Sequence, residues 1–260
     1  MAITKKVIII IFCFVAISTG AWAVYSVFNS PLFSLQVLEV AELPPDAPMD
    51  SRAITDLAAL PLGAVSLFKV DLKMIEQRML ENSWIQQVRL EKKFPQTLSM
   101  SVEFRQPVAF FQTGSGDVSY VDIDGKIFGR LRLNSYTDLP FISGIVVDDK
   151  EKIKTALEIL HGLEKNLDKM SRISNVVWDG QLGFRALVIY PFYGAKGKSS
   201  DQVLFGRAFV ELGPENFVFK DAQFKKITAV ISYLSTHRIS AQRIWADAEK
   251  KIVVKTARSS

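Results

Sequence analysis

The sequence predicts an α+β protein with a single N-terminal transmembrane helix, a first folded domain of order βααββ, and a β-rich C-terminal domain with two helices. Three observations predict this fold class. An uncharged apolar stretch follows Lys5 and Lys6. Two helical apolar stripes then precede a pair of alternating segments, and the remaining chain combines further alternating segments with two more helical stripes. With 260 residues and 48% apolar composition, the chain can bury a core.

Residues 1–6 are expected to form a cytoplasmic tail and residues 7–29 a transmembrane anchor. The uncharged stretch ending at about Ser30 has the length of a helix that crosses a bilayer. Aromatic side chains that favour the lipid–water interface lie near its far end: Trp22, Tyr25 and Phe28. The basic residues in front predict that the N-terminus stays in the cytoplasm and that the rest of the chain is exported.

A cleaved signal peptide is the alternative to an anchor. Ala21-Trp22-Ala23 fits the small-x-small pattern of a cleavage site. The apolar stretch continues through Val24 and Phe28 without a polar run-up to that site, which favours the anchor.

Composition restricts the chemistry of the exported part. The only cysteine is Cys13, inside the apolar stretch, so this part has no disulfide and no cysteine-built zinc or iron–sulfur site. The net charge is +5. Outside the cytoplasm this charge indicates a solvated basic surface with affinity for anionic lipid headgroups or wall polymers, rather than a nucleic-acid-binding protein.

Residues 31–106 are expected to form the first domain. A strand is predicted over residues 33–40, and the prolines after it make a turn. Asp50 or Ser51 caps a short helix with its apolar residues on one face: Ile54, Leu57 and Ala58. Asp71 caps a second helix with one apolar stripe: Leu72, Ile75, Met79 and Leu80.

Two further strands are predicted on either side of Phe94-Pro95. The first has one face made of Trp84, Gln86, Val88 and Leu90. The second alternates clearly, with one face made of Leu98, Met100, Val102 and Phe104. A parallel or mixed three-stranded sheet with both helices on one face buries these stripes.

This part of the chain resembles a POTRA domain, and in detail that of the FtsQ/DivIB family of bacterial division proteins. The residues that carry the resemblance are Gly63, Leu67-Phe68-Lys69-Val70-Asp71-Leu72, Trp84-Ile85, Val88, Phe94-Pro95-Gln96-Thr97-Leu98, Val102-Glu103 and Arg105-Gln106-Pro107-Val108-Ala109.

Residues 107–256 are expected to form a β-rich domain of the FtsQ type. Asp124-Gly125 between apolar flanks predicts a hairpin. The stretch Leu139-Pro140-Phe141-Ile142-Ser143-Gly144 resembles the family after such a hairpin. One helical stripe runs from Ile153 to Leu167, and strands are predicted at residues 172–178 and 184–190. A last helix with Phe224, Ile227, Ile231 and Leu234 on one face precedes two strands, at residues 243–245 and 252–255, and residues 257–260 are expected to be disordered.

Three features invite an enzyme or metal interpretation, and none has the required pattern. Residues 194–200 end like a phosphate-binding loop, but Phe192 stands where that loop needs glycine. Residues 122–125 resemble part of a calcium loop, but Lys126, Ile127 and Leu133 stand where that loop needs a ligand, a glycine and a glutamate. His161 and His237 have no cysteine or ligand partner nearby. The sequence therefore predicts no catalytic residue, cofactor or metal, and no nucleic-acid or small-molecule ligand.

The resemblance implies a function in cell division. FtsQ/DivIB proteins are single-pass proteins of the inner membrane at the division septum, with the bulk of the chain in the periplasm. They act as scaffolds of the divisome that link early cytoplasmic components to FtsB and FtsL, and so to the septal synthase pair FtsW and FtsI. The resemblance implies docking of FtsB by strand addition to the last strands. Candidate contact residues are Tyr233, Trp245, Ile252, Val253, Val254 and Lys255.

One departure from the family concerns this docking strand. Where the family has aspartate, leucine, arginine and tyrosine entering the final hairpin, aligning Ile244 gives Trp245, Ala246, Asp247 and Ala248. Partner identity therefore depends on the whole resemblance and not on these contacts.

Two other functions remain open. A POTRA-bearing envelope transport or assembly factor would bind polypeptides, but it normally carries several such domains or a barrel. A wall hydrolase would need a pair of carboxylates in an acidic cleft, and no stretch of the sequence points to one.

Overall fold

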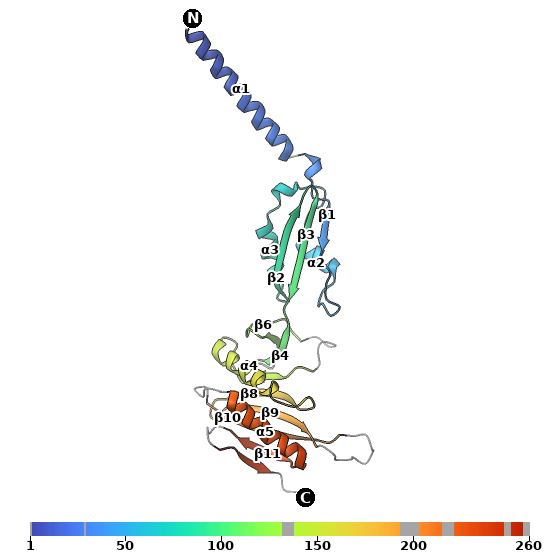
Figure 1. The fold of residues 1–260 in the computed structure, drawn as a ribbon, viewed down its shortest axis with the longest axis vertical. Helices are drawn as coiled ribbons and strands as arrows, with labels where there is room; N and C mark the ends of the chain where they lie inside the picture. The colour runs from blue at the N-terminus through green and yellow to red at the C-terminus, as the bar shows by residue number, and fades with distance from the viewer. Residues whose placement is uncertain are drawn as a thin grey trace. The chain divides into compact units, whose positions relative to one another are not determined.

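The computed structural model in Figure 1 describes residues 2–28, 30–131, 138–192, 203–214, 221–246 and 251–256, without the side chains of residues 2–11 and 23. The chain divides into two compact units, Met1–Arg105 and Gln106–Ser260. Helix α1 (Ala2–Phe28) opens the first. Within the described residues, no helix is both long enough and apolar enough to cross a membrane. The anchor at residues 7–29 stays a prediction, and the side chain of Ala23 and the tail 257–260 lie outside the description.

The first unit contains the predicted βααββ order. Its elements are β1 (Val37–Val40), α2 (Ser51–Ala58), α3 (Leu72–Leu80), β2 (Ile85–Lys93) and β3 (Thr97–Phe104), with short 3₁₀ turns η1 (Pro31–Phe33) and η2 (Leu67–Lys69). The strand order is β1-β3-β2, with β1 parallel and β2 antiparallel to β3. The predicted mixed three-stranded sheet is therefore confirmed, and so are the N-caps, since Asp50 accepts from Ala53 N and Asp71 from Lys73 N.

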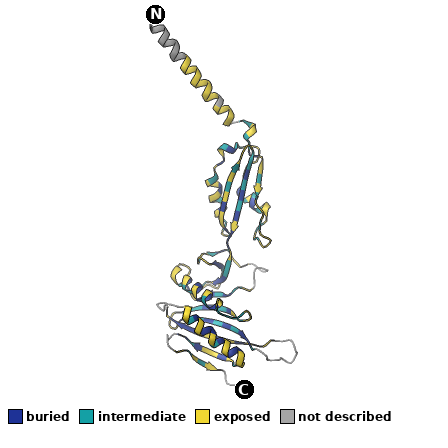
Figure 2. Cartoon of the chain, in the orientation of Figure 1, coloured by how far each residue is buried: buried dark blue, intermediate teal, exposed yellow. Residues whose placement is uncertain are grey.

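One face of this sheet and both helices enclose a single core. Buried residues of β3 alternate as predicted, and α2 and α3 contribute Ile54, Ala58, Ile75 and Met79. Figure 2 shows buried and exposed residues alternating along the strands. The other face of β3 carries Thr97, Ser99, Ser101 and Glu103, so it is polar.

Three predictions for this unit are wrong in detail. The first strand begins at Val37, because residues 31–33 form η1. The face predicted for β2 is correct at Val88 and Leu90 but wrong at Trp84 and Gln86, because the register shifts between Ile85 and Gln87 and brings Ile85 to the core side instead. Leu80 is 40% exposed and does not belong to the buried stripe of α3.

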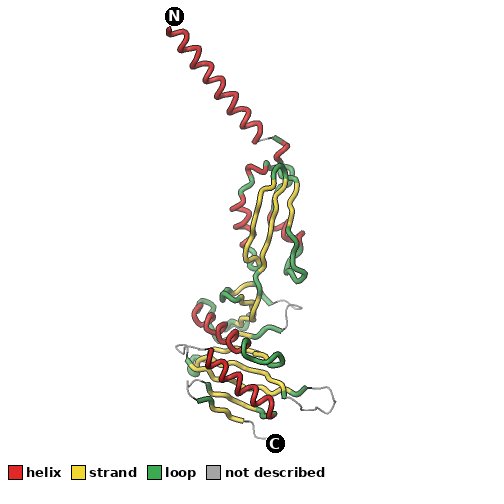
Figure 3. The backbone as a smooth tube through the Cα atoms, viewed as in Figure 1, coloured by secondary structure: helices red, strands yellow, loops and turns green. Residues whose placement is uncertain are grey.

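In the residues that the structure describes, the second unit is one nine-stranded sheet and two helices. Its elements are β4 (Pro107–Gln112), β5 (Val118–Asp122), β6 (Ile127–Phe128), β7 (Phe141–Ser143), α4 (Lys150–Glu164), β8 (Arg172–Asp179), β9 (Gly183–Pro191), β10 (Phe205–Gly213), α5 (Asp221–His237), β11 (Ala241–Trp245) and β12 (Val253–Thr256). The strand order is β12-β11-β10-β9-β8-β7-β4-β5-β6. Figure 3 shows α4 and α5 lying beside these strands.

Most of the predicted elements of this unit are present. Asp122–Lys126 is a turn, as predicted, in which Asp122 Oδ1 accepts from the backbone N–H groups of Asp124 and Lys126, and Gly125 has a positive φ of 82°. The predicted stripes of α4 and α5 are buried in the same core as the inward residues of the strands. The sequence prediction missed β10, and it placed no strand at β4.

Candidate docking edge at the end of the second sheet

Strand β12 is the outermost strand at one end of the second sheet. It pairs antiparallel with β11 in the register Trp245 with Val253, Ile244 with Val254, and Arg243 with Lys255. Within the described residues β12 has a strand neighbour on one side only. A row of backbone N–H and C=O groups therefore remains available to an added strand.

The side chains of β12 divide between two faces. Val254, and Ile252 just before the strand, pack against the core beneath α5. Val253 is 56% exposed, and Lys255 is exposed with it on the opposite face. Ile252 and Val254 therefore hold the strand in place, whereas Val253 and Lys255 can meet a partner.

Two rows of residues cross four strands on the face that α4 and α5 do not cover. The register places Arg185, Glu211, Trp245 and Val253 in one row. The next row is Leu187, Phe209, Arg243 and Lys255. We call these eight residues the outer face. Between these two rows lies a row whose side chains point to the other face of the sheet and pack into the core: Ala186, Val210, Ile244 and Val254.

The outer face combines apolar groups with charge. Phe209 is 39% exposed and Trp245 is partly buried. The guanidinium of Arg185 lies 5.9 Å from the centre of the Phe209 ring. Arg243 Nε lies 4.0 Å from Glu211 Oε1, and the Glu211 carboxylate makes no hydrogen bond in the described part of the chain. The sequence prediction missed Glu211 and Phe209 because it did not identify β10.

Buried hydrogen bonds fix the segment that leads into β11. The Tyr190 hydroxyl donates to Ile239 O and accepts from Ala241 N, both at 3.0 Å. Burial raises the pKa of Tyr190, and the hydrogen bond from Ala241 partly offsets this effect. At the other end of β11, Ala246 N donates to Glu211 O at 2.8 Å and Gln223 on α5 donates to Ala246 O. The position of β12 therefore depends on contacts made by β9, β10 and α5.

The structure does not bring Tyr233 together with the other candidate residues. Tyr233 lies on α5, which covers the core face of the sheet, whereas Trp245 lies on the outer face. Tyr233 is 57% exposed, and its ring stacks on His237 with a centroid distance of 3.9 Å. A strand added to β12 could therefore contact both aromatic residues only through side chains on its two opposite faces.

The motifs set aside in the sequence can also be located. Asp122 accepts turn hydrogen bonds, as described above, and His161 lies within α4. Among the residues that the structure describes, no three His, Cys, Asp or Glu side chains are grouped to hold a metal ion. Residues 194–200, and Asp247 and Ala248 of the altered hairpin, lie outside the description.

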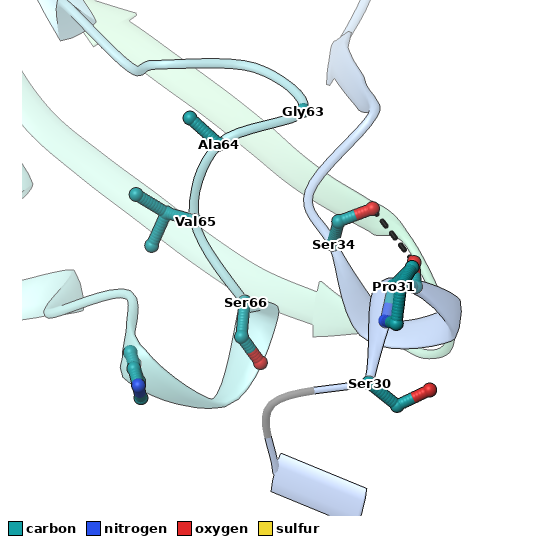
Figure 4. Close-up of a pocket in the computed structure, with 8 residues that line it drawn as sticks. Ser30, Pro31, Ser34, Gly63, Ala64, Val65 and Ser66 are labelled. Atoms are coloured by element: carbon teal, nitrogen blue, oxygen red, sulfur yellow. Dashed lines mark hydrogen bonds between the residues drawn. The ribbon is translucent and has the colours of Figure 1, made fainter. Parts of the chain in front are cut away.

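A second polar feature lies in the first unit. A hollow of about 340 Å³ is lined by Ser30, Pro31, Ser34, residues 63–66 and Lys69. Figure 4 shows the loop from Gly63 to Ser66 on one side of it and Ser30, Pro31 and Ser34 on the other. Ser34 Oγ donates to Pro31 O at 2.8 Å, and the buried Ser66 Oγ has no hydrogen-bond partner in the described residues. The hollow thus combines hydroxyl groups with one lysine.

Two protein families match the chain. A POTRA domain family of the FtsQ type matches residues 48–103, and the C-terminal domain of the cell division protein FtsQ/DivIB matches residues 109–239. The second match covers half of the chain. Strands β1 and β12, each at one edge of its sheet, lie outside the matched residues.

Several related proteins carry the name cell division protein FtsQ. The one from Geotalea daltonii is 29% identical over 178 residues, which are 65% of this chain and 62% of the relative. The one from Geobacter sp. strain M21 is 29% identical over 64% of this chain and 62% of the relative. The one from Zymomonas mobilis is 30% identical over 56% of this chain and 45% of the relative. The matched part spans about six tenths of the length of the first two relatives.

Proposed function

Because the chain belongs to the FtsQ/DivIB family of cell division proteins, we propose that it is a bitopic scaffold of the divisome at the septum. Residues 7–29 would anchor it in the inner membrane, with the N-terminus in the cytoplasm and the two folded units in the periplasm. It would link early cytoplasmic division components to FtsB-like and FtsL-like partners, and through them to the FtsW/FtsI synthase. The observation that carries this proposal is the open strand β12, which follows the residues 109–239 that match the family's C-terminal domain.

The docking mechanism is addition of a partner strand to β12. Backbone hydrogen bonds to the open side of β12 supply part of the affinity, and the side chains around it select the partner. Val253 and Lys255 lie on the outer face of this edge, and Trp245 is the adjacent aromatic anchor. On the outer face Arg185 forms an ion pair with Asp179 at 3.4 Å and Arg243 lies 4.0 Å from Glu211, so the charge that favours an acidic residue in the partner segment is that of Lys255.

The proposed role is binding rather than catalysis. Family membership supports it, because the relatives carry the name of a division protein. Ile252 and Val254 act by supporting the strand, and Tyr233 requires a separate test because it lies on the core-side helix.

A second candidate function is supported by one observation. Strand β1 is also an open edge, and Val37 on it is 47% exposed. An envelope transport or assembly factor would bind polypeptides at such an edge of its POTRA domain. The two functions therefore predict different docking strands.

Depletion of the protein in its native cells, combined with a fluorescent fusion, tests the division role. We expect filamentous cells without septa, and a fusion that gathers at midcell before depletion. Cells that divide normally with the fusion spread evenly over the envelope would contradict the division role. A fusion with Val253→Lys separates localisation from docking: it should reach midcell and still fail to restore division.

A further inference from the structure

Four phenylalanine rings meet at one end of the first unit, where the chain leaves α1. Phe28 is the last residue of α1, Phe33 lies in η1, Phe68 lies in η2, and Phe94 lies in the turn between β2 and β3. The ring centroid of Phe68 is 4.7 Å from that of Phe28, 5.0 Å from Phe33 and 4.8 Å from Phe94. We call these four residues and the neighbouring Leu32 the aromatic pole.

The aromatic pole is not closed over by the rest of the unit. Leu32 is 69% exposed, Phe94 is 53% exposed and Phe28 is 43% exposed. The core of the unit lies on the face that α2 and α3 cover, and it does not include these three side chains. A contiguous group of exposed apolar side chains indicates a surface that contacts another apolar phase or molecule.

Lysine side chains surround the aromatic pole. Lys69 follows Phe68 and lines the hollow shown in Figure 4. Lys92 donates to Phe68 O at 3.3 Å, and Lys93 precedes Phe94 and forms an ion pair with Glu39 at 2.9 Å. Glu39 and Glu91 both raise the pKa of Lys93. Aromatic rings flanked by lysines are typical of surfaces at the lipid–water interface, where the rings enter the interface and the amines contact phosphate groups.

We propose that the aromatic pole is a membrane-docking surface: Leu32 and Phe94 enter the interface of the bilayer in which α1 is anchored, and Lys69 contacts lipid phosphate groups. The inference rests on the proposed anchor. Two observations select lipid as the occupant. The contact between Phe28 and Phe68 joins the end of the predicted bilayer-spanning segment directly to the pole. The lysines supply the charge that anionic headgroups require.

Docking of this kind would give the first unit a fixed relation to the bilayer surface instead of leaving it on a free tether. Strands β1 and β3 run away from the pole, because they are parallel and β3 begins just after Phe94. Residues after β1, such as Glu42, therefore lie at the far end of the unit. Depth in the bilayer should fall steeply between Phe94 and Glu42.

Spin-label depth measurements on the full chain test this prediction. Cys13→Ser removes the native thiol, and single cysteines at Phe94→Cys or Glu42→Cys then carry a nitroxide. The chain is placed in nanodiscs of phosphatidylethanolamine and phosphatidylglycerol, and power saturation is measured with oxygen and with a water-soluble nickel chelate. We expect the ratio of oxygen to nickel accessibility to be several-fold higher at position 94 than at position 42. Leu32→Cys provides a second position at the pole if the Phe94 variant folds poorly.

The outcomes separate this inference from the proposed function. If the protein enters the nanodiscs but the labels at positions 94 and 32 show the oxygen-to-nickel accessibility ratio of a label in water, the inference is overturned. The anchor and the division role then stay intact. Protein that does not enter the nanodiscs contradicts the anchor and, with it, the inference. Labels that become shielded only after FtsB and FtsL are added assign the pole to a protein partner and overturn lipid docking.

A charge variant tests the part of the proposal that concerns Lys69. Lys69→Glu should move the label at position 94 towards water, and Lys73→Glu, on the exposed side of α3, should not. Equal depth in all three proteins would show that apolar contact alone holds the pole, and would remove the phosphate contact from the proposal.

Discussion

The two sheets each end in an open four-residue strand with one strongly exposed valine, yet the surfaces beside these strands differ. Val37 of β1 is 47% exposed and Val253 of β12 is 56% exposed. Beside β1, Val37 lies in a row with Thr97 of β3 and Lys93 of β2. Glu39 lies in a row with Ser99 of β3 and Glu91 of β2. Beside β12, it continues into Trp245, Phe209 and Leu187 on the outer face.

This difference shows that an open edge is not by itself a docking site. Backbone hydrogen bonds are equally available at both edges, so they cannot decide between them. A partner also needs apolar area to bury and charges to match, and β12 adjoins a surface with both. The polar, ion-paired face beside β1 is typical of an edge that is protected from unwanted pairing, with Lys93 bound to Glu39 and Arg89 to Glu103.

The largest effect is expected where β12 depends on a support that β1 lacks. Tyr190→Phe removes the hydroxyl that bonds Ile239 O and Ala241 N, and so leaves a buried N–H without its partner. We expect a loss of about 1–3 kcal/mol in the free energy of unfolding of the second unit. Hydrogen exchange should accelerate in β11 and β12 and stay unchanged in β1, as measured by mass spectrometry on the full chain.

Tyr233→Phe is the matched control, because Tyr233 is exposed on α5. We expect it to change the free energy of unfolding by less than about 0.5 kcal/mol. Equal exchange in both variants would show that the Tyr190 hydrogen bonds do not hold the docking strand.

A paired substitution at the two edges gives the next effect in size. Val253→Lys places a charge in the proposed strand-addition surface, and Val37→Lys places the same charge on the other open edge. For binding of purified FtsB–FtsL, we expect Val253→Lys to weaken affinity by about tenfold, which is about 1.4 kcal/mol, and Val37→Lys to have almost no effect. Isothermal titration calorimetry measures both. The reverse result would move docking to β1 and favour the transport or assembly function.

Much of the fold follows from the sequence because its signals are local. The Asp50 and Asp71 caps and the turn at Asp124-Gly125 each need only a few neighbouring residues to specify them. The period-two pattern of residues 98–104 and the helical stripe of α5 are also continuous, and both are buried as predicted.

The errors arise where tertiary pairing overrides a local pattern. The bulge after Ile85 places Ile85, instead of Trp84 and Gln86, on the core side of β2, and no local rule predicts this bulge, because it depends on the register with β3. The sequence analysis placed no element at β10, where the apolar Phe209 stands at an exposed position and so weakens the alternation of residues 206–210. Strand order is a long-range property as well, so the outer face, which joins residues from four strands, could not be assembled from the sequence.

A cap variant tests whether the two units act independently. Asp71→Ala removes the side chain that accepts from Lys73 N and Met74 N at the start of α3. We expect a loss of about 1 kcal/mol in the stability of the first unit, with faster hydrogen exchange in α3 and β2. Exchange in β10–β12 and affinity for FtsB–FtsL should stay unchanged, and Asp71→Asn should retain most of the cap. A loss of affinity in the Asp71→Ala protein would mean that the first unit takes part in docking.

The smallest expected effect is a pH dependence of opposite sign in the two units. In the second unit, hydrogen bonds lower the pKa of three aspartates below 3.8: Asp149 bonds Lys152, Asp179 bonds the backbone of Gln181 and Leu182, and Asp221 bonds Lys225. A carboxyl whose pKa is lower in the folded than in the unfolded state contributes stability above the unfolded pKa, and this stability is lost as the pH falls through the folded value. In the first unit, the hydrogen bond to Glu39 raises the pKa of Lys93 above 10.5, so its contribution is present below that value and is lost as the pH rises through the folded pKa.

Hydrogen exchange corrected for intrinsic rates should therefore show the second unit weakening first below pH 4 and the first unit losing the Lys93 contribution above pH 10. Because Lys93 and Asp221 are exposed and Asp149 and Asp179 are partly exposed, the effects should be small and should shrink further in high salt. An acid response that persists unchanged when Asp149, Asp179 and Asp221 are all replaced by Asn would place its origin in other groups and remove this distinction between the units.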